Sequence, residues 1–190
     1  GQALVAVRAT EDVVRGRRVS VETGFASSLV ANHDSGLALW LPNPVWRPLP
    51  QIKSQARIEA PLYRATAVLT ELDQIDPRLE LDSAVDAVLR WLKLSLGADL
   101  KVIRRGPAPL RGRPSIRIEA DYRVEKIGKV EHFRAQVHVF RERDRYLALC
   151  CTAPRELHKE LETDYQRICR SIELTRDDFV PKPQGPLKKD

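Results

Sequence analysis

The sequence predicts an α+β protein whose strands form antiparallel hairpins and whose helices are few and separate. Two stretches, 82–97 and 154–172, place apolar residues at helical spacing. Four strand candidates lie in a row between them, at 99–105, 115–124, 131–140 and 145–152. Two further strand candidates precede the first helix. Runs of strands with segregated helices are typical of the α+β class.

The elements before residue 82 are a short apolar strand and a longer, partly alternating one. The segment "LALWLPNPVW" (37–46) is a strand that Pro42 and Pro44 stop, because proline cannot donate to a sheet ladder. The segment 62–72 alternates partially and is the second strand. We therefore expect the body of the protein to begin with two strands.

The first helix is predicted over 82–97. Its apolar positions follow the helical period and form one buried stripe: Val85, Val88, Leu89, Leu92 and Leu96. Asp82 or Ser83 can cap its start, and Gly97 can close it. The last helix is predicted over 154–172, with Pro154 in its first turn and one apolar stripe.

The hairpin joining 115–124 to 131–140 can be registered from its pattern of apolar and polar residues. Closing the loop with Glu125 opposite Val130 pairs apolar residues with apolar ones on one face. The apolar pairs are Tyr122–Phe133, Ala120–Ala135, Ile118–Val137 and Ile116–Val139, and the polar pairs are Asp121–Arg134, Glu119–Gln136 and Arg117–His138. A slip of one residue would mix the two faces, so this register is well specified.

The second hairpin is predicted to turn over three residues, 142–144, because aspartate tolerates a left-handed position. Val139 then faces Leu147, and Ala135 faces Cys151. This register places Cys151 on the apolar face and Cys150 on the opposite face, since neighbouring strand residues point apart.

Three interpretations of the cysteines remain open from the sequence. The first is that they are small buried residues at a strand end. The second is a disulfide between Cys169 on the last helix and one of the pair, with Cys151 as the partner on the packed face. The third, a catalytic or metal-binding thiol, is the weakest, because the spacing matches no zinc pattern.

The polar face of the first hairpin is the candidate binding surface. Arg117, Asp121, Arg134 and His138 are its candidate contact residues for a partner. The competing interpretation is a solvated sheet face with cross-strand ion pairs, which we favour because its acids and bases compensate each other.

The composition of the chain and its lack of known motifs argue against several classes of function. The chain has 43% hydrophobic and 31% charged residues and a net charge of +6, and its basic residues mostly interleave with acidic ones. We expect no nucleic acid partner, no cofactor and no metal, and no apolar run reaches membrane-spanning length. No phosphate loop or nucleophile motif occurs, and His33 and His158 have no histidine at ligand spacing.

The chain divides into an N-terminal extension with short strands (1–35), a main domain (36–174) and a Pro/Lys-rich tail (175–190). The strand candidates of the extension are 4–7 and 17–24, and 31–36 has turn chemistry. The sequence starts at Gly1 and contains no methionine, so we favour the bacterial cell envelope over the cytoplasm.

Two segments resemble a known group. "SGLALWLPNPVW" (35–46) resembles the opening of the PsbP/Mog1-like superfamily, which includes bacterial DcrB-type proteins. "RYLALCCTAPRELHKELETDYQRICRSIEL" (145–174) resembles its ending, with Tyr165, Ile168 and Ser171 in the aromatic-x-x-Ile-x-x-Ser pattern. The aromatic residue that usually follows the serine is Ile172 here.

The resemblance implies an antiparallel sheet of about six strands flanked by helices, an α/β/α sandwich. It also implies a non-catalytic function, since members include photosystem subunits, a GTPase-binding transport factor, envelope lipoproteins and chaperones. We therefore expect a bacterial accessory, chaperone or assembly module whose partner is another protein. The alternative is an envelope protein that binds a small molecule or lipid, and an enzyme with an unusual site ranks below both.

Overall fold

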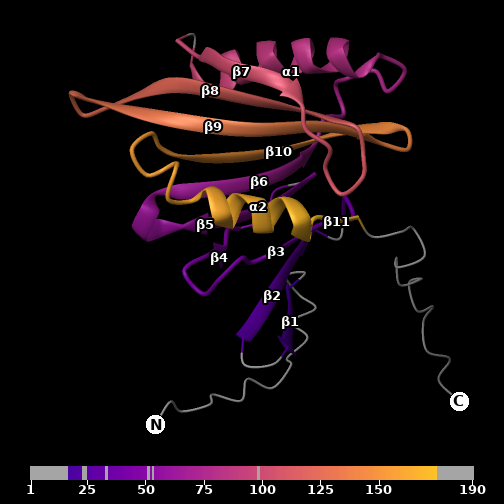
Figure 1. Cartoon of the computed structure of the whole chain (residues 1–190), viewed down its shortest axis with the longest axis vertical. Helices are drawn as coiled ribbons and strands as arrows, with labels where there is room; N and C mark the ends of the chain where they lie inside the picture. Colours follow the sequence, from indigo (N-terminus) through magenta and orange to yellow (C-terminus); the bar gives the residue numbers. More distant parts are fainter. Residues whose placement is uncertain are drawn as a thin grey trace, which may run out of the picture.

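The computed structural model describes residues 17–22, 25–32, 34–50, 52, 54–97 and 99–174 (Figure 1). The predicted strand at 4–7, His33 and the tail 175–190 lie outside the described residues. The boundaries predicted at 35 and 175 stay predictions. Residues 17–22 form a strand, as expected for the N-terminal extension.

The described chain is an α+β protein built on two antiparallel sheets, which confirms the predicted fold class. The large sheet has the order β4-β5-β6-β10-β9-β8-β7, and the small sheet has the order β1-β2-β3-β11. The strands of the large sheet are β4 (Arg47–Pro48), β5 (Gln55–Ala60), β6 (Ala65–Glu71), β7 (Lys101–Pro107), β8 (Ser115–Lys126), β9 (Lys129–Glu142) and β10 (Arg145–Pro154). Those of the small sheet are β1 (Arg17–Glu22), β2 (Phe25–Asn32), β3 (Leu37–Trp40) and β11 (Glu173–Leu174).

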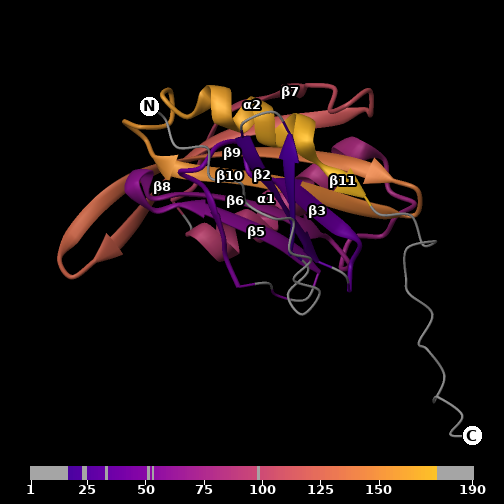
Figure 2. The ribbon, with the colours of Figure 1, turned by 90° about the horizontal axis from the view of Figure 1, so that it is seen from below.

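Two helices cover opposite faces of the large sheet (Figure 2). Helix α1 (Leu81–Leu96) packs its buried stripe on the face that carries Ile118 and Val137. Helix α2 (Glu162–Ser171) packs Tyr165 and Ile168 on the other face, among residues of β3, β5, β6 and β10. The apolar area removed from water in these two layers is the main stabilising term of the fold.

The starts of the two helices differ from the sequence prediction. Helix α1 ends as predicted, with the Gly97 N–H donating to the Lys93 carbonyl and Gly97 at φ +123°. The expected cap at Asp82 or Ser83 was wrong, because Glu80 is the N-cap and makes no side-chain capping bond. Helix α2 begins at Glu162 rather than 154, since Pro154 still belongs to β10, opposite Phe133.

The register of the β8–β9 hairpin is confirmed at every predicted pair, including Asp121–Arg134 and Ile118–Val137. The ladder continues to Lys126–Lys129, so the turn consists of Ile127 and Gly128, both with positive φ. The end of this hairpin projects from the body of the protein in both ribbon views (Figures 1 and 2).

The register of the β9–β10 hairpin was predicted wrongly by one residue. Its turn has two residues, Arg143 and Asp144, so Cys150 faces Val137 and Cys151 faces Gln136. The two cysteines therefore exchange faces: Cys150 lies on the α1 side and Cys151 in the core beneath α2. The prediction failed because β10 is buried on both faces, so its pattern does not choose between registers.

Strand β5 was not predicted. Its residues alternate between half-buried and buried, and the buried positions are Ala56, Ile58 and Ala60. Alanine has low β propensity and little hydrophobic area, so the alternation is weak in the sequence. The predicted strand 62–72 is shortened to β6 because residues 61–63 form a single 3₁₀ turn.

Candidate functional site

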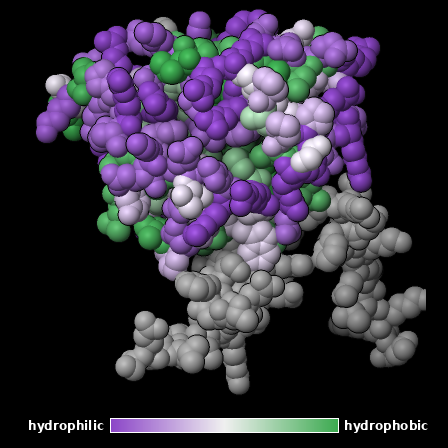
Figure 3. Space-filling view, in the orientation of Figure 1, coloured by the Kyte–Doolittle hydropathy of each residue, from purple (hydrophilic) through white to green (hydrophobic). Residues whose placement is uncertain are grey.

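The candidate site lies on the polar face of β8 and β9, at the side of α2. In antiparallel pairs, directly opposite residues share a face, so Arg117, Glu119 and Asp121 lie beside His138, Gln136 and Arg134. This is the face identified from the alternation of the sequence. In the space-filling view, the visible surface of the described part is mainly hydrophilic, with apolar residues in small separate patches (Figure 3).

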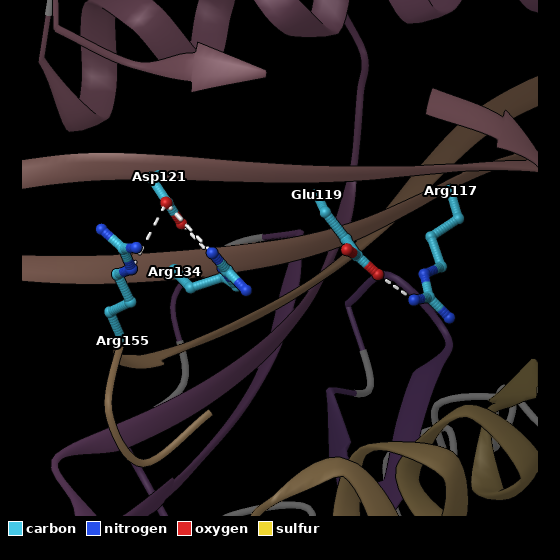
Figure 4. Close-up of polar contacts among 5 residues, drawn as sticks. All are labelled: Arg117, Glu119, Asp121, Arg134 and Arg155. Carbon is cyan, nitrogen blue, oxygen red and sulfur yellow. Dashed lines mark hydrogen bonds and ion pairs between the residues drawn. The ribbon is translucent and has the colours of Figure 1, made fainter. Parts of the chain in front are cut away.

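Asp121 is the centre of the ion-pair network. Arg134 binds it in a bidentate manner, with Nε–Oδ1 at 2.7 Å and the second guanidinium nitrogen 3.0 Å from Oδ2. Arg155 approaches Oδ2 from the other side at 3.7 Å (Figure 4). The hydrogen bonds from Arg134 hold the pKa of the Asp121 carboxyl below its usual value. Asp121 is therefore a carboxylate at neutral pH, shared by two cations.

A second ion pair joins Arg117 to Glu119 on the same strand (Figure 4). The Glu119 side chain is 14% exposed and that of Arg117 is 30% exposed. The pair is thus half-buried beside α2, in contrast to a fully solvated sheet face. Our expectation of a solvated face was accurate only for its outer residues.

His138 is buried, with 6% of its surface exposed. Its Nε2 lies 3.1 Å from Gln136 Nε2 and its Nδ1 lies 3.5 Å from Ser115 Oγ. Burial, with a smaller contribution from the Arg117 charge, lowers the pKa of His138 from 6.5 to about 4. The ring is neutral at pH 7 and is not presented to a partner at the surface.

Helix α2 and the turn before it cover the inner part of this face. The rings of His158 and Tyr165 lie 5.2 Å apart, and both residues are buried. Neither His158 Nε2 nor the Tyr165 hydroxyl has a hydrogen-bond partner among the described residues. Burial lowers the pKa of His158 and raises that of Tyr165, so both groups are neutral at pH 7. A neutral phenol with a strongly raised pKa is a poor nucleophile.

Strand β7 extends the polar face to the edge of the sheet. Lys101 lies opposite Asp121 and Arg104 lies opposite Glu119, so both cations are on the polar face. Neither makes an ion pair or side-chain hydrogen bond with another described residue, whereas Arg123 pairs with Asp99. Apart from that balanced pair, the polar face has five cations against three carboxylates. The cations are Lys101, Arg104, Arg117, Arg134 and Arg155, and the carboxylates are Glu119, Asp121 and, nearer the hairpin turn, Glu125. The face is therefore basic.

The structure thus brings three of the four predicted contact residues together near the surface: Arg117, Asp121 and Arg134. The contact residues predicted from the sequence did not include Lys101, Arg104 or Arg155. The strand at 99–105 was predicted, but its pairing with β8 contains a bulge between Val102 and Arg104 that no alternation pattern would reveal. Arg155 was placed in a helix that begins later.

Other site chemistry is limited in the part of the chain that the structure describes. No group of three or more His, Cys, Asp or Glu residues there could hold a metal ion. None of its helices has the length and hydropathy needed to cross a membrane. An open hollow of about 700 Å³ lies where the 111–113 turn meets β11, and Arg111, Arg113, Glu142 and Glu173 supply its charged lining.

The three cysteines are free thiols in the structure. Burial raises the pKa of Cys150 to about 12 and that of Cys169 to about 11. Cys151 and Cys169 line the same core, between α2 and the sheet. The disulfide between them stays a prediction.

Comparisons with known proteins identify the fold. No family model matches the sequence, and no curated protein matches it. Among solved structures, the chain is similar to the Saccharomyces cerevisiae Ran-binding protein Mog1p, with 11% identity over 78% of this chain and 95% of that chain, and a TM-score of 0.54. It is also similar to cyanobacterial PsbP (CyanoP) from Synechocystis sp. PCC 6803, with 11% identity over 90% of this chain and 99% of that chain, and a TM-score of 0.50.

The class that these observations define is an antiparallel α+β sandwich with a basic, ion-paired sheet face. More particularly, its fold is PsbP/Mog1-like, as the resemblance of residues 35–46 and 145–174 implied. At 11% identity the likeness concerns the fold alone.

Proposed function

We propose that the chain is a non-catalytic module that binds another protein and serves as an accessory, chaperone or assembly factor in a bacterium. The observation that carries this proposal is the basic sheet face centred on Asp121, where five cations lie against three carboxylates. Such a face favours an acidic partner surface, because complementary charge steers association and selects partners. Arg117, Asp121, Arg134 and the more exposed Arg155 are the proposed contact residues.

The neutral state of the buried histidines supports a binding function over catalysis. A general base needs a pKa near the working pH and a position within reach of substrate. The pKa of His138 is about 4 and its ring is buried. His158, in the turn before α2, is also buried, and burial lowers its pKa. The Ran-binding protein Mog1p offers a precedent for a protein partner on this fold.

The alternative function, binding of a small molecule or lipid, has weaker support. The hollow at the 111–113 turn has a lining dominated by charged residues, whereas a lipid tail requires an apolar site. A small polar ligand would suit it better. Native mass spectrometry of the purified protein tests this alternative, since a retained ligand would add a defined mass to the 21.6 kDa chain.

The proposal is tested by affinity capture from a lysate of the organism that encodes the chain, at low and moderate salt. We compare the wild type with Arg134→Glu and with Arg155→Glu, whose side chain is 59% exposed in the wild type. One stoichiometric protein should survive moderate salt and be lost with both variants. The matched control is Arg170→Glu on the exposed side of α2, which should retain it. Equal capture by all four folded proteins would refute this surface.

A further inference from the structure

Strand β7 is a long, exposed edge of the large sheet. It is the last strand in the sheet order, and β8 is its only strand partner in the described chain. Six of its seven residues are exposed, including Val102 and Ile103, which are 38% and 47% exposed. The opposite edge is different: β4 has two residues, and one of them is Pro48. An unpaired edge of this length presents free backbone groups that can pair with another strand.

The side chains of β7 divide between the two faces of the sheet. Lys101 and Arg104 lie on the polar face without ion-pair partners in the described chain, as shown above. Arg105 lies on the other face, because it is opposite Ile118, and it binds Asp82 and Asp86 of α1 at 2.9 and 2.5 Å. Arg105 therefore fixes the strand to the helix, while the two other cations remain available at the edge.

The charge of the edge selects its occupant. A second copy pairing through β7 would bring Lys101 and Arg104 of both chains close together, and like charges on neighbouring strands are destabilising. An extended segment with acidic side chains on alternate residues would instead place its carboxylates beside these cations. Its intervening residues would lie on the side of Val102, which faces the same way as Ala120. An acidic, alternating strand thus complements β7 in charge and presents its carboxylates on the face of these cations.

We infer that β7 is a docking edge that accepts an extended acidic segment of a partner protein as an additional strand of the large sheet. Backbone hydrogen bonds to β7 supply affinity, and Lys101 and Arg104 select acidic side chains. The inference rests on the proposed function in one respect, since both require a protein partner. The contact residues are different, because the docking edge uses the backbone of β7 with Lys101 and Arg104, which border the face of Arg134 and Arg155.

The test uses a fluorescein-labelled nine-residue peptide of alternating glutamate and valine, measured by fluorescence anisotropy with the purified full chain. We expect binding that weakens as salt rises, because the cations and carboxylates are exposed. The Lys101→Glu/Arg104→Glu variant should raise the Kd at least tenfold. The Lys159→Glu/Arg170→Glu variant has the same change in net charge on exposed residues away from β7 and should leave the Kd within twofold.

A second peptide separates strand addition from simple charge attraction. Methylation of every peptide nitrogen keeps the side chains but removes the backbone donors, so we expect at least tenfold weaker binding. Hydrogen exchange should slow within 101–107 when the unmethylated peptide is present. Equal binding of the methylated peptide, or no binding of the unmethylated one, would overturn the inference. So would a wild-type dimer in analytical ultracentrifugation that Lys101→Glu/Arg104→Glu dissociates, because the edge would then pair with itself.

The failure of this inference is distinguishable from that of the proposed function. Loss of peptide binding at β7 concerns Lys101 and Arg104, whereas partner capture is tested at Arg134 and Arg155. A partner that is captured through Arg134 while β7 binds no acidic peptide would leave the proposed function standing and refute the docking edge.

Discussion

The indole Nε1 of Trp46 donates a hydrogen bond to Asp164 Oδ2 at 2.9 Å, which joins the loop after β3 to helix α2. Asn43 Nδ2 donates to both oxygens of the same carboxylate at 2.8 Å. Trp46 is 2% exposed and packs edge-on against Tyr165, with ring centroids 6.4 Å apart. One carboxylate therefore satisfies two donors that anchor the loop over the core.

Substitution of Asp164 by alanine should destabilise the protein. It leaves the buried Trp46 N–H and the Asn43 amide without their acceptor, at a cost of about 1.5–3 kcal/mol. Urea denaturation followed by tryptophan fluorescence measures this change. Thr163→Ala, at an exposed neighbouring position on α2, is the control and should change the free energy of unfolding by less than about 0.5 kcal/mol. Equal effects of the two substitutions would contradict the anchoring role.

Replacement of His138 should reduce the pH dependence of stability. Because its pKa falls from 6.5 in the unfolded chain to about 4 in the fold, the unfolded state binds more protons between these values. The contribution of His138 to the free energy of unfolding is complete above pH 6.5. It decreases as the pH drops toward 4, by at most about 3 kcal/mol. His138→Gln, which keeps a hydrogen-bonding side chain, should flatten this decline in urea denaturation at pH 7, 6 and 5. His132→Gln is the matched control on an exposed residue and should retain the wild-type decline.

The turn of the β8–β9 hairpin offers a stabilising substitution. Ile127 adopts φ +48°, which a β-branched residue rarely does, and its side chain is fully exposed. Asparagine is favoured before glycine in two-residue turns with two positive φ values. Ile127→Asn should therefore raise the free energy of unfolding by about 0.5–1 kcal/mol. Val130→Asn, an exposed strand position of the same hairpin, should not raise it, and a gain in both variants would attribute the effect to polarity instead of backbone geometry.

Arg134 and Asp121 should be coupled energetically. Their bidentate pair is 26% and 19% exposed, so we expect a coupling free energy of about 1 kcal/mol in a double-mutant cycle with Arg134→Met and Asp121→Asn. The coupling should decrease as salt is added. The Arg78–Asp76 pair, whose arginine side chain is 88% exposed, is the comparison and should show weaker coupling. If the two pairs had the same coupling free energy, partial burial at Asp121 would not strengthen the ion pair.

Thiol titration distinguishes the two structural interpretations of the cysteines. In the structure all three are free; Cys151 and Cys169 are buried and Cys150 is half-buried. Burial raises the pKa of each thiol, so a thiol reagent should react slowly with the native protein. After unfolding without reductant, we expect three reactive thiols per chain. A count of one would instead show that one disulfide is present, as the predicted Cys151–Cys169 bond requires, and peptide mapping would identify its two cysteines.

Strands and their registers could be predicted from the sequence where polar and apolar residues alternate clearly. The β8–β9 register was predictable because Ile118 and Glu119 belong to faces of opposite polarity. The β9–β10 register was not, because Leu149, Cys150 and Cys151 are all apolar and the strand is packed on both faces. Strand β5 escaped prediction because two of its three buried positions are alanines.

The candidate site was predicted only as far as its own hairpin. Arg117, Asp121 and Arg134 follow from the register of β8 and β9. The burial of His138 depends on how α2 and neighbouring strands pack over the face, and the addition of Lys101 and Arg104 depends on the bulge in β7. These are tertiary relationships that local patterns do not encode.

The pairing of β11 with β3 has a consequence for the order in which the protein folds during synthesis. Glu173 lies opposite Ala38, and its carboxylate accepts a hydrogen bond from the Trp40 indole at 2.8 Å. Ser171 Oγ also accepts from the Trp40 backbone N–H. The ribosome makes these partners of β3 more than 130 residues after β3 itself. The small sheet can therefore be completed only near the end of translation. When β3 leaves the ribosome, the edge that later pairs with β11 is still unpaired.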